Sequence, residues 1–258
     1  MKKFILDLDI VENQRLNYQY VLLKLTHSET LPPILPGQFA QIRVDGSPET
    51  FLRRPISINF VDTERNQLWL LIQVVGAGTR CLAELKVGEK LNLIFPLGNS
   101  FTVPEDKKAQ IALIGGGVGV APMLMYGEWL HRHGYKPNFL IGARSEVDLL
   151  QLEEFSKYGK VFTTTEDGTH GEQGYITQHS CLKSLSFDYI FTCGPTPMMK
   201  AVARYAQEKG IFCEVSLENL MGCGIGACLC CVTDTTEGNL CVCTEGPIFN
   251  VTKLKWQI

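Results

Sequence analysis

The sequence lacks the features by which membrane proteins, exported proteins and nucleic-acid-binding proteins are recognised. Its 258 residues carry a formal net charge of -3 without a basic block, so neither a nucleic acid nor an anionic membrane is indicated as a partner. The longest apolar run, residues 111–125, is broken by glycines and a proline and is too short to span a bilayer. Only three apolar residues directly precede Asp7, too few for a signal peptide. We therefore expect a soluble, cytoplasmic protein without membrane insertion.

Histidine is also scarce, and hydrolytic motifs are missing. Only His131 and His133, among five histidines, are close together, and no third ligand is nearby, which argues against a catalytic zinc centre. The sequence has no nucleophile elbow, so Ser/His/Asp hydrolysis has no support. It also has no internal repeat and no low-complexity tract. The chemistry of this chain must therefore reside in other side chains.

Cysteine, by contrast, is abundant and unevenly placed. Six of the ten cysteines fall between Cys223 and Cys243. Ten cysteines without an export signal favour reduced thiols and metal ligation over disulfides. Cys223, Cys228 and Cys231 reproduce the C-x4-C-x2-C spacing of plant-type two-iron clusters, with Cys243 available as a distant fourth thiolate. This pattern predicts a centre that transfers single electrons.

The six thiols exceed the four that a two-iron cluster needs. Cys230 could replace Cys231 only through a C-x-C turn, which departs from the expected spacing. On a strand, Cys241 and Cys243 would project to the same face, so periodicity does not separate them. A structural zinc site is the alternative, but such sites usually pair two C-x2-C elements, and only one such pair is clear here. We predict a [2Fe-2S] cluster.

Residues 1–103 are predicted to form a small antiparallel barrel. Stretches rich in β-branched and aromatic residues alternate with turn signals, and little helical periodicity is present. Short strands joined by turns are typical of a closed barrel. The predicted strands cover residues 4–16, 18–26, 38–44, 56–61, 68–75 and 91–98.

From Gln110 the pattern changes to that of an α/β domain. An apolar strand is followed by a glycine turn and an amphipathic helix, with Pro122 suited to the first turn of the helix and Gly134 to its end. The alternation continues, which predicts a parallel sheet covered by helices. We expect three parts: a barrel over residues 1–103, an α/β domain over 104–215, and a small [2Fe-2S] subdomain over 216–258.

Two stretches of the barrel have the residue types of a flavin site. Arg54 and Ser57 lie three apart in an extended segment. A guanidinium makes planar, bidentate contacts with a pyrophosphate, and a nearby hydroxyl can hydrogen-bond the edge of a flavin ring. Residues 76–79, Gly-Ala-Gly-Thr, offer backbone amides and a hydroxyl for a second phosphate contact. Each stretch alone would also fit a solvated turn or loop.

Two turns of the second domain suggest a dinucleotide. The glycine run at residues 115–119 follows a strand and opens a helix, where backbone amides can bind a pyrophosphate. It departs from the G-x-G-x-x-G fingerprint because Val120 occupies the third glycine position. The Cys-Gly-Pro turn at 193–195 follows a second apolar strand and precedes a methionine-led helix. A tight turn and a small buried cysteine are the structural alternatives.

Together these motifs resemble the ferredoxin–NADP reductase superfamily, in which an R-x-x-S motif and a later G-x-T loop hold FAD against a barrel. The first match here is residues 54–57, and the looser second match is residues 76–79. The resemblance places Cys193, as the catalytic residue, beside the nicotinamide ring. It implies FAD contacts from Arg54, Pro55, Ile56, Ser57, Leu71, Ile72, Gln73, Gly78 and Thr79, and NAD contacts from Gly115, Gly116, Gly117, Gly194 and Pro195.

Charge distinguishes NAD from NADP. In NADP-using relatives, a Ser-Arg pair after an earlier strand of this domain takes the 2′-phosphate. The corresponding stretch here carries Glu166 and Asp167, which would repel a phosphate dianion and could accept from a ribose hydroxyl. Arg144 is the counter-argument, since it could reach that phosphate. We predict NAD, with Glu166 at the ribose.

The order of barrel, NAD domain and C-terminal C-x4-C-x2-C-x11-C segment resembles the electron-transfer subunits of NAD-dependent dihydroorotate dehydrogenase type B. The resemblance covers essentially the whole chain, and residues 216–232 are its most specific part. Cys230 stands where another residue type is usual, and Cys241 is an additional thiol. The ligands that the resemblance implies are Cys223, Cys228, Cys231 and Cys243.

In that family, dihydroorotate is oxidised at an FMN in a separate catalytic subunit during pyrimidine biosynthesis. Electrons then pass through the two-iron cluster to FAD and leave to NAD+. The resemblance implies a heterotetramer of two plus two subunits. Apolar residues near the cysteines are candidates for the partner surface or for packing around the cluster: Leu220, Met221, Ile225 and Leu229.

Two other functions fit parts of the pattern. A related flavin and iron–sulfur module could serve a sulfite reductase, a hydrogenase or an NADH-dependent ferredoxin–NADP oxidoreductase. A non-enzymatic binding module with a zinc-stapled C-terminal segment is the alternative from another class. Iron, sulfide and flavin content would separate the second from the first.

Overall fold

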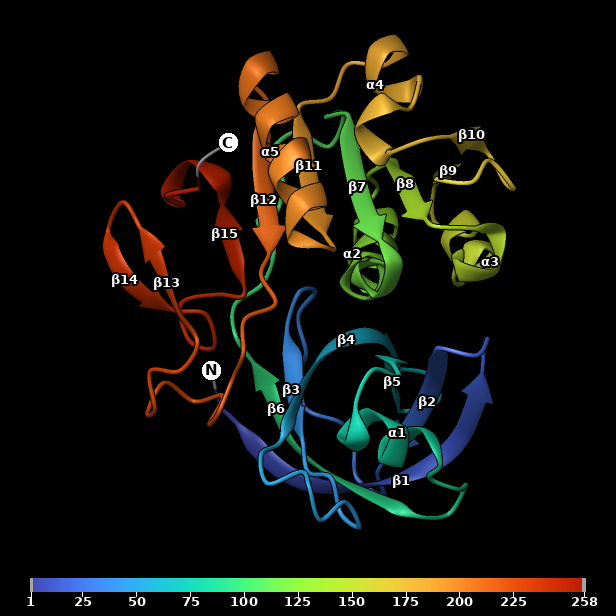
Figure 1. The fold of residues 1–258 in the computed structure, drawn as a ribbon, viewed down its shortest axis with the longest axis vertical. Helices are drawn as coiled ribbons and strands as arrows, with labels where there is room; N and C mark the ends of the chain where they lie inside the picture. The colour runs from blue at the N-terminus through green and yellow to red at the C-terminus, as the bar shows by residue number, and fades with distance from the viewer. Residues whose placement is uncertain (1, 257–258) are drawn as a thin grey trace.

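The computed structural model describes residues 2–256, which form a barrel, an α/β sheet domain and a C-terminal segment that contacts both (Figure 1). The closed barrel has the strand order β1-β2-β5-β4-β3-β6 with antiparallel pairing, as predicted. Its elements are β1 (Phe4–Arg15), β2 (Tyr20–Thr26), β3 (Phe39–Ile42), β4 (Arg54–Asp62), β5 (Gln67–Gln73), α1 (Ala77–Ala83) and β6 (Lys90–Leu97).

The barrel closes because alternate apolar side chains of its strands point inward. Val21, Leu23 and Leu25 of β2 are all fully buried in one core, together with Ala40 and Ile42 of β3. Burial of this kind stabilises a fold by about 25 cal/mol for each Å² of apolar surface. The alternating residues of β3 therefore point out of the barrel, toward the rest of the molecule.

The second part is a sheet with the order β10-β9-β8-β7-β11-β12-β15 (Figure 1). Pairing is parallel from β10 to β12, which confirms the predicted alternation of strands and helices. Its first five strands in the chain are β7 (Ile111–Gly116), β8 (Pro137–Ala143), β9 (Lys160–Thr165), β10 (Glu172–Gln173) and β11 (Tyr189–Cys193); β12 (Phe212–Ser216) follows.

Helices cover both faces of this sheet. The side chains of α2 and α3 share one buried core with the sheet, and those of α4 and α5 share the other. α2 also packs against β4, so it lies between the sheet and the barrel (Figure 1). The helices are η1 (Gly117–Val120), α2 (Ala121–Arg132), η2 (Glu146–Asp148), α3 (Leu152–Ser156), η3 (Ile176–Gln178), α4 (Cys181–Ser184) and α5 (Thr196–Lys209).

The C-terminal segment returns to the sheet. Its strand β15 (Ile248–Asn250) pairs antiparallel with β12, so the parallel sheet has an antiparallel edge. Buried Val242 and Phe249 of this segment belong to the same core cluster as α5, and so do Phe39 and Leu97 of the barrel. The remaining elements are the hairpin of β13 (Val232–Thr235) and β14 (Gly238–Cys241), and η4 (Val251–Lys253).

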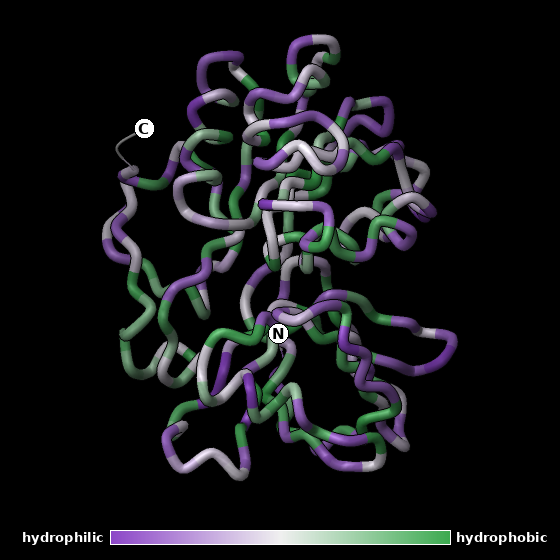
Figure 2. Tube along the Cα trace, turned by 45° about the vertical axis from the view of Figure 1, so that its right-hand side comes forward, coloured by the Kyte–Doolittle hydropathy of each residue, from purple (hydrophilic) through white to green (hydrophobic). Residues whose placement is uncertain are grey.

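Apolar residues follow the central strands of both halves, while hydrophilic residues gather on the outer loops (Figure 2). Within residues 2–256, no helix combines the length and apolar character needed to cross a membrane.

Candidate functional site

Four thiols of the C-terminal segment accept backbone N–H groups from the same segment. The Cys223 Sγ accepts from three amides at 3.3 to 3.4 Å, those of Ile225, Ala227 and Cys228. The Cys228 Sγ accepts from the amide of Cys223 at 3.4 Å. The other two thiols accept one amide each: Cys231 from Cys243 at 3.4 Å, and Cys243 from Gly226 at 3.2 Å.

Two glycines allow this loop to curl around the sulfurs. Gly224 and Gly226 adopt φ angles of 70° and 84°, a left-handed conformation that other residues rarely adopt. A Cβ at Gly226 would lie 2.8 Å from the Cγ2 of Thr244. Glycine at these positions thus directs backbone donors at the thiols.

The N–H groups of the loop also lower the pKa of one of these thiols. The amide of Ile225, with further donors from Cys228 and Ala227, lowers the pKa of Cys223 to about 6. Burial raises the pKa of Cys243 to about 12. Donors aimed at sulfur are what a negatively charged iron–sulfur centre requires of its surroundings, so the residues fit a [2Fe-2S] cluster. In residues 2–256, no three Cys, His, Asp or Glu side chains are grouped so as to hold a single metal ion.

The two surplus thiols lie in different surroundings. Cys230 is exposed and Cys241 is half-buried, whereas Cys231 and Cys243 are 2% and 1% exposed. The expectation that Cys241 and Cys243 share one face of a strand is wrong. The strand β14 ends at Cys241, because the amides of Thr244 and Glu245 bond its carbonyl and form a turn. The turn carries Cys243 into the interior.

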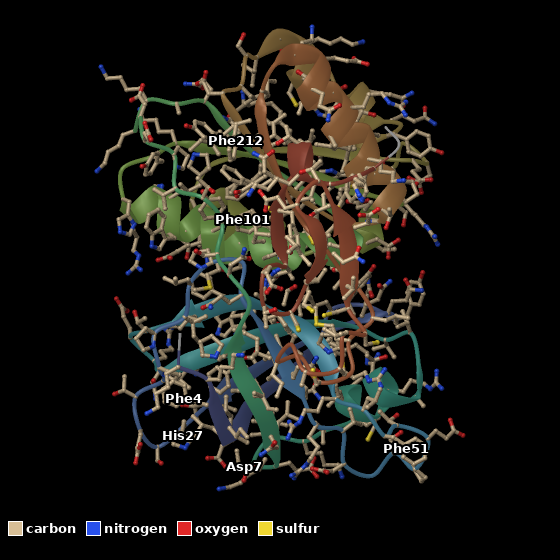
Figure 3. The ribbon with its side chains drawn as sticks, turned by 90° about the vertical axis from the view of Figure 1, so that its left-hand side faces the viewer. Phe4, Asp7, His27, Phe51, Phe101 and Phe212 are labelled. Carbon is tan, nitrogen blue, oxygen red and sulfur yellow. The ribbon has the colours of Figure 1, made fainter. Side chains whose placement is uncertain are left out.

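The cluster loop lies directly on the barrel, where sulfur atoms gather between the barrel and the β13–β14 hairpin (Figure 3). A Cβ at Gly224 would lie 2.5 Å from the Cγ of Gln41 on β3. A second contact joins the end of β6 to the same segment, since the amide of Asn99 donates to the carbonyl of Gly246 at 2.6 Å. The thiols are therefore held against the barrel wall.

The predicted flavin stretch begins β4, beside this contact. Pro55 pairs with Gln41 and Ser57 with Phe39 in the β3–β4 ladder. Arg54 is half-buried and its guanidinium donates to the carbonyl of Leu52 at 3.1 and 3.3 Å. Neighbouring Arg53 is engaged with the barrel, since it donates to the carbonyls of Gln41 and Asn92 at 3.2 Å. Of these two arginines, the structure thus leaves Arg54 better placed for a ligand.

The second phosphate stretch meets the first. A Cβ at Gly78 would lie 3.6 Å from the Cδ of Arg54, so the start of α1 and the arginine are neighbours. The hydroxyl of Thr79 is used within its own turn, where it accepts from the amides of Val75 and Gly76 at 2.9 and 3.1 Å. On β5, the side chains of Leu71 and Ile72 are buried in the cores.

A cleft of about 620 Å³ lies between the barrel and the carboxyl ends of the parallel strands. This is the edge at which open α/β sheets bind nucleotides. The structure brings most of the predicted NAD residues to it and leaves Gly115 inside β7. Lining residues that the sequence singled out are Gln73, Gly116, Gly117, Arg144, Glu166, Gly194 and Pro195.

Two turns meet at the centre of this cleft. A Cβ at Gly119 would lie 2.4 Å from the carbonyl oxygen of Cys193 and 2.5 Å from the Cα of Gly194. Only a glycine lets the β7 turn and the β11 turn approach this closely, and the parallel pairing of β7 with β11 aligns them. The glycine run thus has a packing reason besides any phosphate contact.

Cys193 is buried behind the cleft, and Glu218 is a residue that the sequence did not reveal. The thiol of Cys193 donates to the Oε1 of Glu218 at 3.8 Å. Glu218 is an exposed residue that lines the cleft, and desolvation by the protein atoms around it raises its pKa. Burial likewise raises the pKa of Cys193, with the negative charge of Glu218 as the next cause. Only the parallel pairing of β11 with β12 brings these residues, 25 apart in the chain, together.

The far end of the cleft holds both signs of charge. Glu166 and Arg144 both line it. Asp167 turns away, because its carboxylate accepts from the amide and hydroxyl of Thr169 at 3.0 and 2.7 Å, and these bonds lower its pKa. Glu166 is therefore the carboxylate available to a ribose.

Two family models match this chain in the parts just described. The iron-sulfur cluster binding domain of dihydroorotate dehydrogenase B matches residues 218–255, and the oxidoreductase NAD-binding domain matches residues 113–204. The first range contains all six clustered cysteines, and the second contains most of the cleft.

The chain is also similar to solved structures and to curated proteins. A structure described as an NADH-dependent reduced ferredoxin-NADP oxidoreductase superposes with a TM-score of 0.87 at 26% identity, covering 96% of this chain and 90% of that one. A curated dihydroorotate dehydrogenase B (NAD(+)), electron transfer subunit, from Shouchella clausii is 39% identical over 221 residues, 84% of this chain and 85% of the relative. The subunit of the same description from Fusobacterium nucleatum is 36% identical, with 83% and 84% covered.

Barrel, sheet and cysteine segment together define an NAD-linked oxidoreductase of the ferredoxin–NADP reductase type that carries an iron–sulfur segment. FAD, a [2Fe-2S] cluster and NAD are the cofactors that this combination supports. Within that class, the chain belongs to the family of electron transfer subunits of dihydroorotate dehydrogenase B (NAD(+)). The resemblance read from the sequence is confirmed.

Proposed function

We propose that this chain carries electrons from an FMN-containing catalytic subunit that oxidises dihydroorotate, through a [2Fe-2S] cluster and FAD, to NAD+ in pyrimidine biosynthesis. The observation that carries the proposal is the set of four amide-bonded thiols held against the barrel beside the flavin stretch. The family membership and the match of the iron–sulfur domain to residues 218–255 support it. The requirement for reduced thiols supports a cytoplasmic location.

In this proposal the cluster ligands are Cys223, Cys228, Cys231 and Cys243. Each of the four accepts at least one backbone N–H, and for Cys230 and Cys241 the described residues provide no such donor to sulfur. We propose that the chain divides into the barrel, the NAD-binding domain and the cluster subdomain expected from the sequence, with boundaries at residues 103 and 215. The return of β15 to the sheet attaches the third part firmly to the second.

The barrel residues would hold FAD. Bound FAD can exchange an electron pair with a nicotinamide and single electrons with an iron–sulfur cluster, so it suits a position between the two. Arg54 would bind the pyrophosphate with the backbone at Gly78, and Ser57 and Gln73 would bind the ring edge. Pro55, Ile56, Leu71, Ile72 and Thr79 would shape the surface through backbone and packing contacts.

The cleft would hold NAD. Gly116 and Gly117 would bind the pyrophosphate beside η1, Gly194 and Pro195 would lie along the nicotinamide, and Gly115 would close the turn from within β7. Glu218 would accept at Oε1 the proton that is released when reduced flavin passes its electrons on singly, and would return it when electrons flow toward NAD+. Cys193 bonds Glu218 and so orients it.

We expect Glu166→Gln to weaken NADH binding and to reduce the preference for NADH over NADPH. A lost hydrogen bond from a charged acceptor costs roughly 1.5–3 kcal/mol, or about a tenfold to hundredfold change in affinity. The KM values of both nucleotides, measured by NADH and NADPH oxidation with ferricyanide, test this. Asp167→Asn is the matched control, because its carboxylate bonds Thr169 instead. An unchanged ratio in Glu166→Gln would contradict the assignment.

The surface around the thiols fits a protein partner. Leu220, Leu229 and Ile225 are 86%, 64% and 46% exposed, while Met221 is buried at 8%. Leu229 also holds a φ of 57°, an uncommon conformation for a leucine. Apolar side chains exposed around a redox centre suit the docking of a catalytic subunit. We propose an assembly of two of these chains with two catalytic subunits.

The direct test is anaerobic purification with and without the co-expressed catalytic subunit. We expect the chain alone to contain iron, sulfide and FAD and to oxidise NADH with ferricyanide, but not to oxidise dihydroorotate. Addition of the catalytic subunit should couple dihydroorotate oxidation to NAD+ reduction. A colourless chain without flavin or iron would refute the proposal, as would dihydroorotate oxidation without a partner.

The similarity to the NADH-dependent reduced ferredoxin-NADP oxidoreductase structure favours one second candidate, a reductase module for another complex. The same preparation distinguishes it. Reduced ferredoxin driving NADP+ reduction, with no coupling to the dihydroorotate-oxidising subunit, would favour this alternative.

A further inference from the structure

A buried glutamine lies between the flavin stretch and the cluster loop. Gln41 on β3 is 0% exposed, and within residues 2–256 neither its Oε1 nor its Nε2 has a hydrogen-bond partner. Buried side-chain amides are nearly always bonded, because an unpaired one loses the hydrogen bonds that water provided. Gln41 is thus a buried amide for which the described part of the protein supplies no hydrogen-bond partner.

The surroundings of Gln41 are the two cofactor stretches. Its neighbours Ala40 and Ile42 are in the barrel core, so the Gln41 side chain points out of the barrel. Its ladder partner on β4 is Pro55, within the predicted flavin motif. Its amide lies against Gly224, next to the ligand Cys223. One side chain therefore reaches from the FAD surface to the cluster loop.

The amide presents its donor end to the loop. The position of a Cβ at Gly224 is 2.8 Å from the Nε2 of Gln41 and 3.0 Å from its Cδ, and the Oε1 is not among the three nearest atoms. Sulfur atoms of a cluster carry negative charge and accept hydrogen bonds only. A cluster sulfur is therefore an acceptor that could pair with Nε2.

From this geometry we infer that Gln41 is a positioning residue for the iron–sulfur centre, donating from Nε2 to a sulfur of the bound cluster. The inference rests on the proposed function. A donor to sulfur stabilises the reduced, more negative cluster and so raises its reduction potential. Gln41 thereby adjusts how easily the cluster takes an electron, at the point where cluster and flavin surfaces meet.

The test replaces the amide by an apolar side chain of similar size. Gln41→Met and Gln41→Leu should each lower the equilibrium constant for one-electron reduction of the cluster about tenfold. This corresponds to a reduction potential lower by about 59 mV. The FAD potential should not move. The exchangeable proton coupling to the reduced cluster, observed by electron–nuclear double resonance in H₂O and D₂O, should diminish. Two variants are used so that a loss of iron in one does not end the measurement.

Gln38→Met is the matched control. Gln38 is also a buried glutamine beside β3, 1% exposed, but its Nε2 donates to the carbonyl of Gly98 at 2.9 Å and its Oε1 accepts from Leu35 at 2.8 Å. Its substitution should lower the melting temperature and leave the cluster potential unchanged.

Three results would overturn the inference. They are an unchanged cluster potential in iron-loaded Gln41 variants, an equal shift in Gln38→Met, and a shift confined to FAD. If the unaltered chain itself bound no cluster, the proposed function would fail instead, so the two failures are distinguishable.

Discussion

Single serine substitutions of the four proposed ligands are each expected to empty the iron–sulfur site, while the same change at Cys230 leaves it filled. Four-ligand structural zinc sites contribute about 10–16 kcal/mol, or about 3 kcal/mol per ligand. On that scale, one lost thiolate should weaken retention of the cluster roughly 100-fold. The substitutions are at Cys223, Cys228, Cys231 and Cys243.

Iron and sulfide per chain, counted after anaerobic purification, measure this result. FAD content serves as the folding control, because the proposed flavin contacts lie in the barrel. Cys230→Ser and Cys241→Ser are the matched variants from the same segment, and both should keep the visible absorbance of the cluster. Loss of iron in Cys230→Ser with retention in Cys231→Ser would reverse the assignment. Electron transfer to NAD+ in the complex should fail wherever iron is lost.

The parts of this site that local sequence could predict are those in which one short segment does the chemistry. The spacing of Cys223, Cys228 and Cys231 matches the spacing of ligands in plant-type two-iron clusters, and two glycines between them adopt left-handed turns. Alternating apolar residues likewise identified the strands of the barrel and sheet. These features depend on neighbours in the chain, so the chain displays them.

Other features depend on contacts between distant segments, and the sequence did not reveal them. Glu218 meets Cys193 only because β12 pairs with β11. Gln41 meets Gly224 only because the C-terminal segment folds back on the barrel. Cys241 and Cys243 do not share a strand face because β14 ends at Cys241 in a turn, and a turn of this kind is not visible in the periodicity.

Glu218→Gln is expected to slow NADH oxidation with ferricyanide by about 100-fold in kcat, with a small change in KM. A positioned group that transfers a proton typically contributes about 10²–10⁴-fold to a rate. Glu218 is the titratable group of the cleft that bonds Cys193, and the glutamine variant keeps its shape without its proton chemistry. A loss confined to KM would show that Glu218 only binds the nucleotide.

The pH dependence of the NADH oxidation rate tests the same role of Glu218, and its direction can be predicted. Oxidation of one NADH by two ferricyanide ions releases one proton, which leaves when reduced flavin passes its electrons on. Glu218 would accept that proton, so the rate should rise as pH increases through the pKa of Glu218. Glu218 is solvent-exposed at the cleft, but desolvation by the surrounding protein raises its pKa above the ordinary value for glutamate. The rise of rate with pH should therefore lie at higher pH than for a carboxyl free in water. The Glu218→Gln variant should not show this rise of rate with pH. Cys193→Ala should move it higher still, since the thiol bond lowers the pKa of Glu218.

The Glu214→Gln variant is a control that distinguishes an effect on proton transfer from an effect on stability. Glu214 lies on β12, four residues before Glu218, and burial raises its pKa too. Its carboxylate, however, accepts from the amide and hydroxyl of Thr102 at 2.9 and 2.6 Å. Substitution of Glu214 should lower the melting temperature and leave the rise of the NADH oxidation rate with pH unchanged. If Glu214→Gln abolished the rise of rate with pH while Glu218→Gln retained it, Glu218 would not be the group that exchanges the proton.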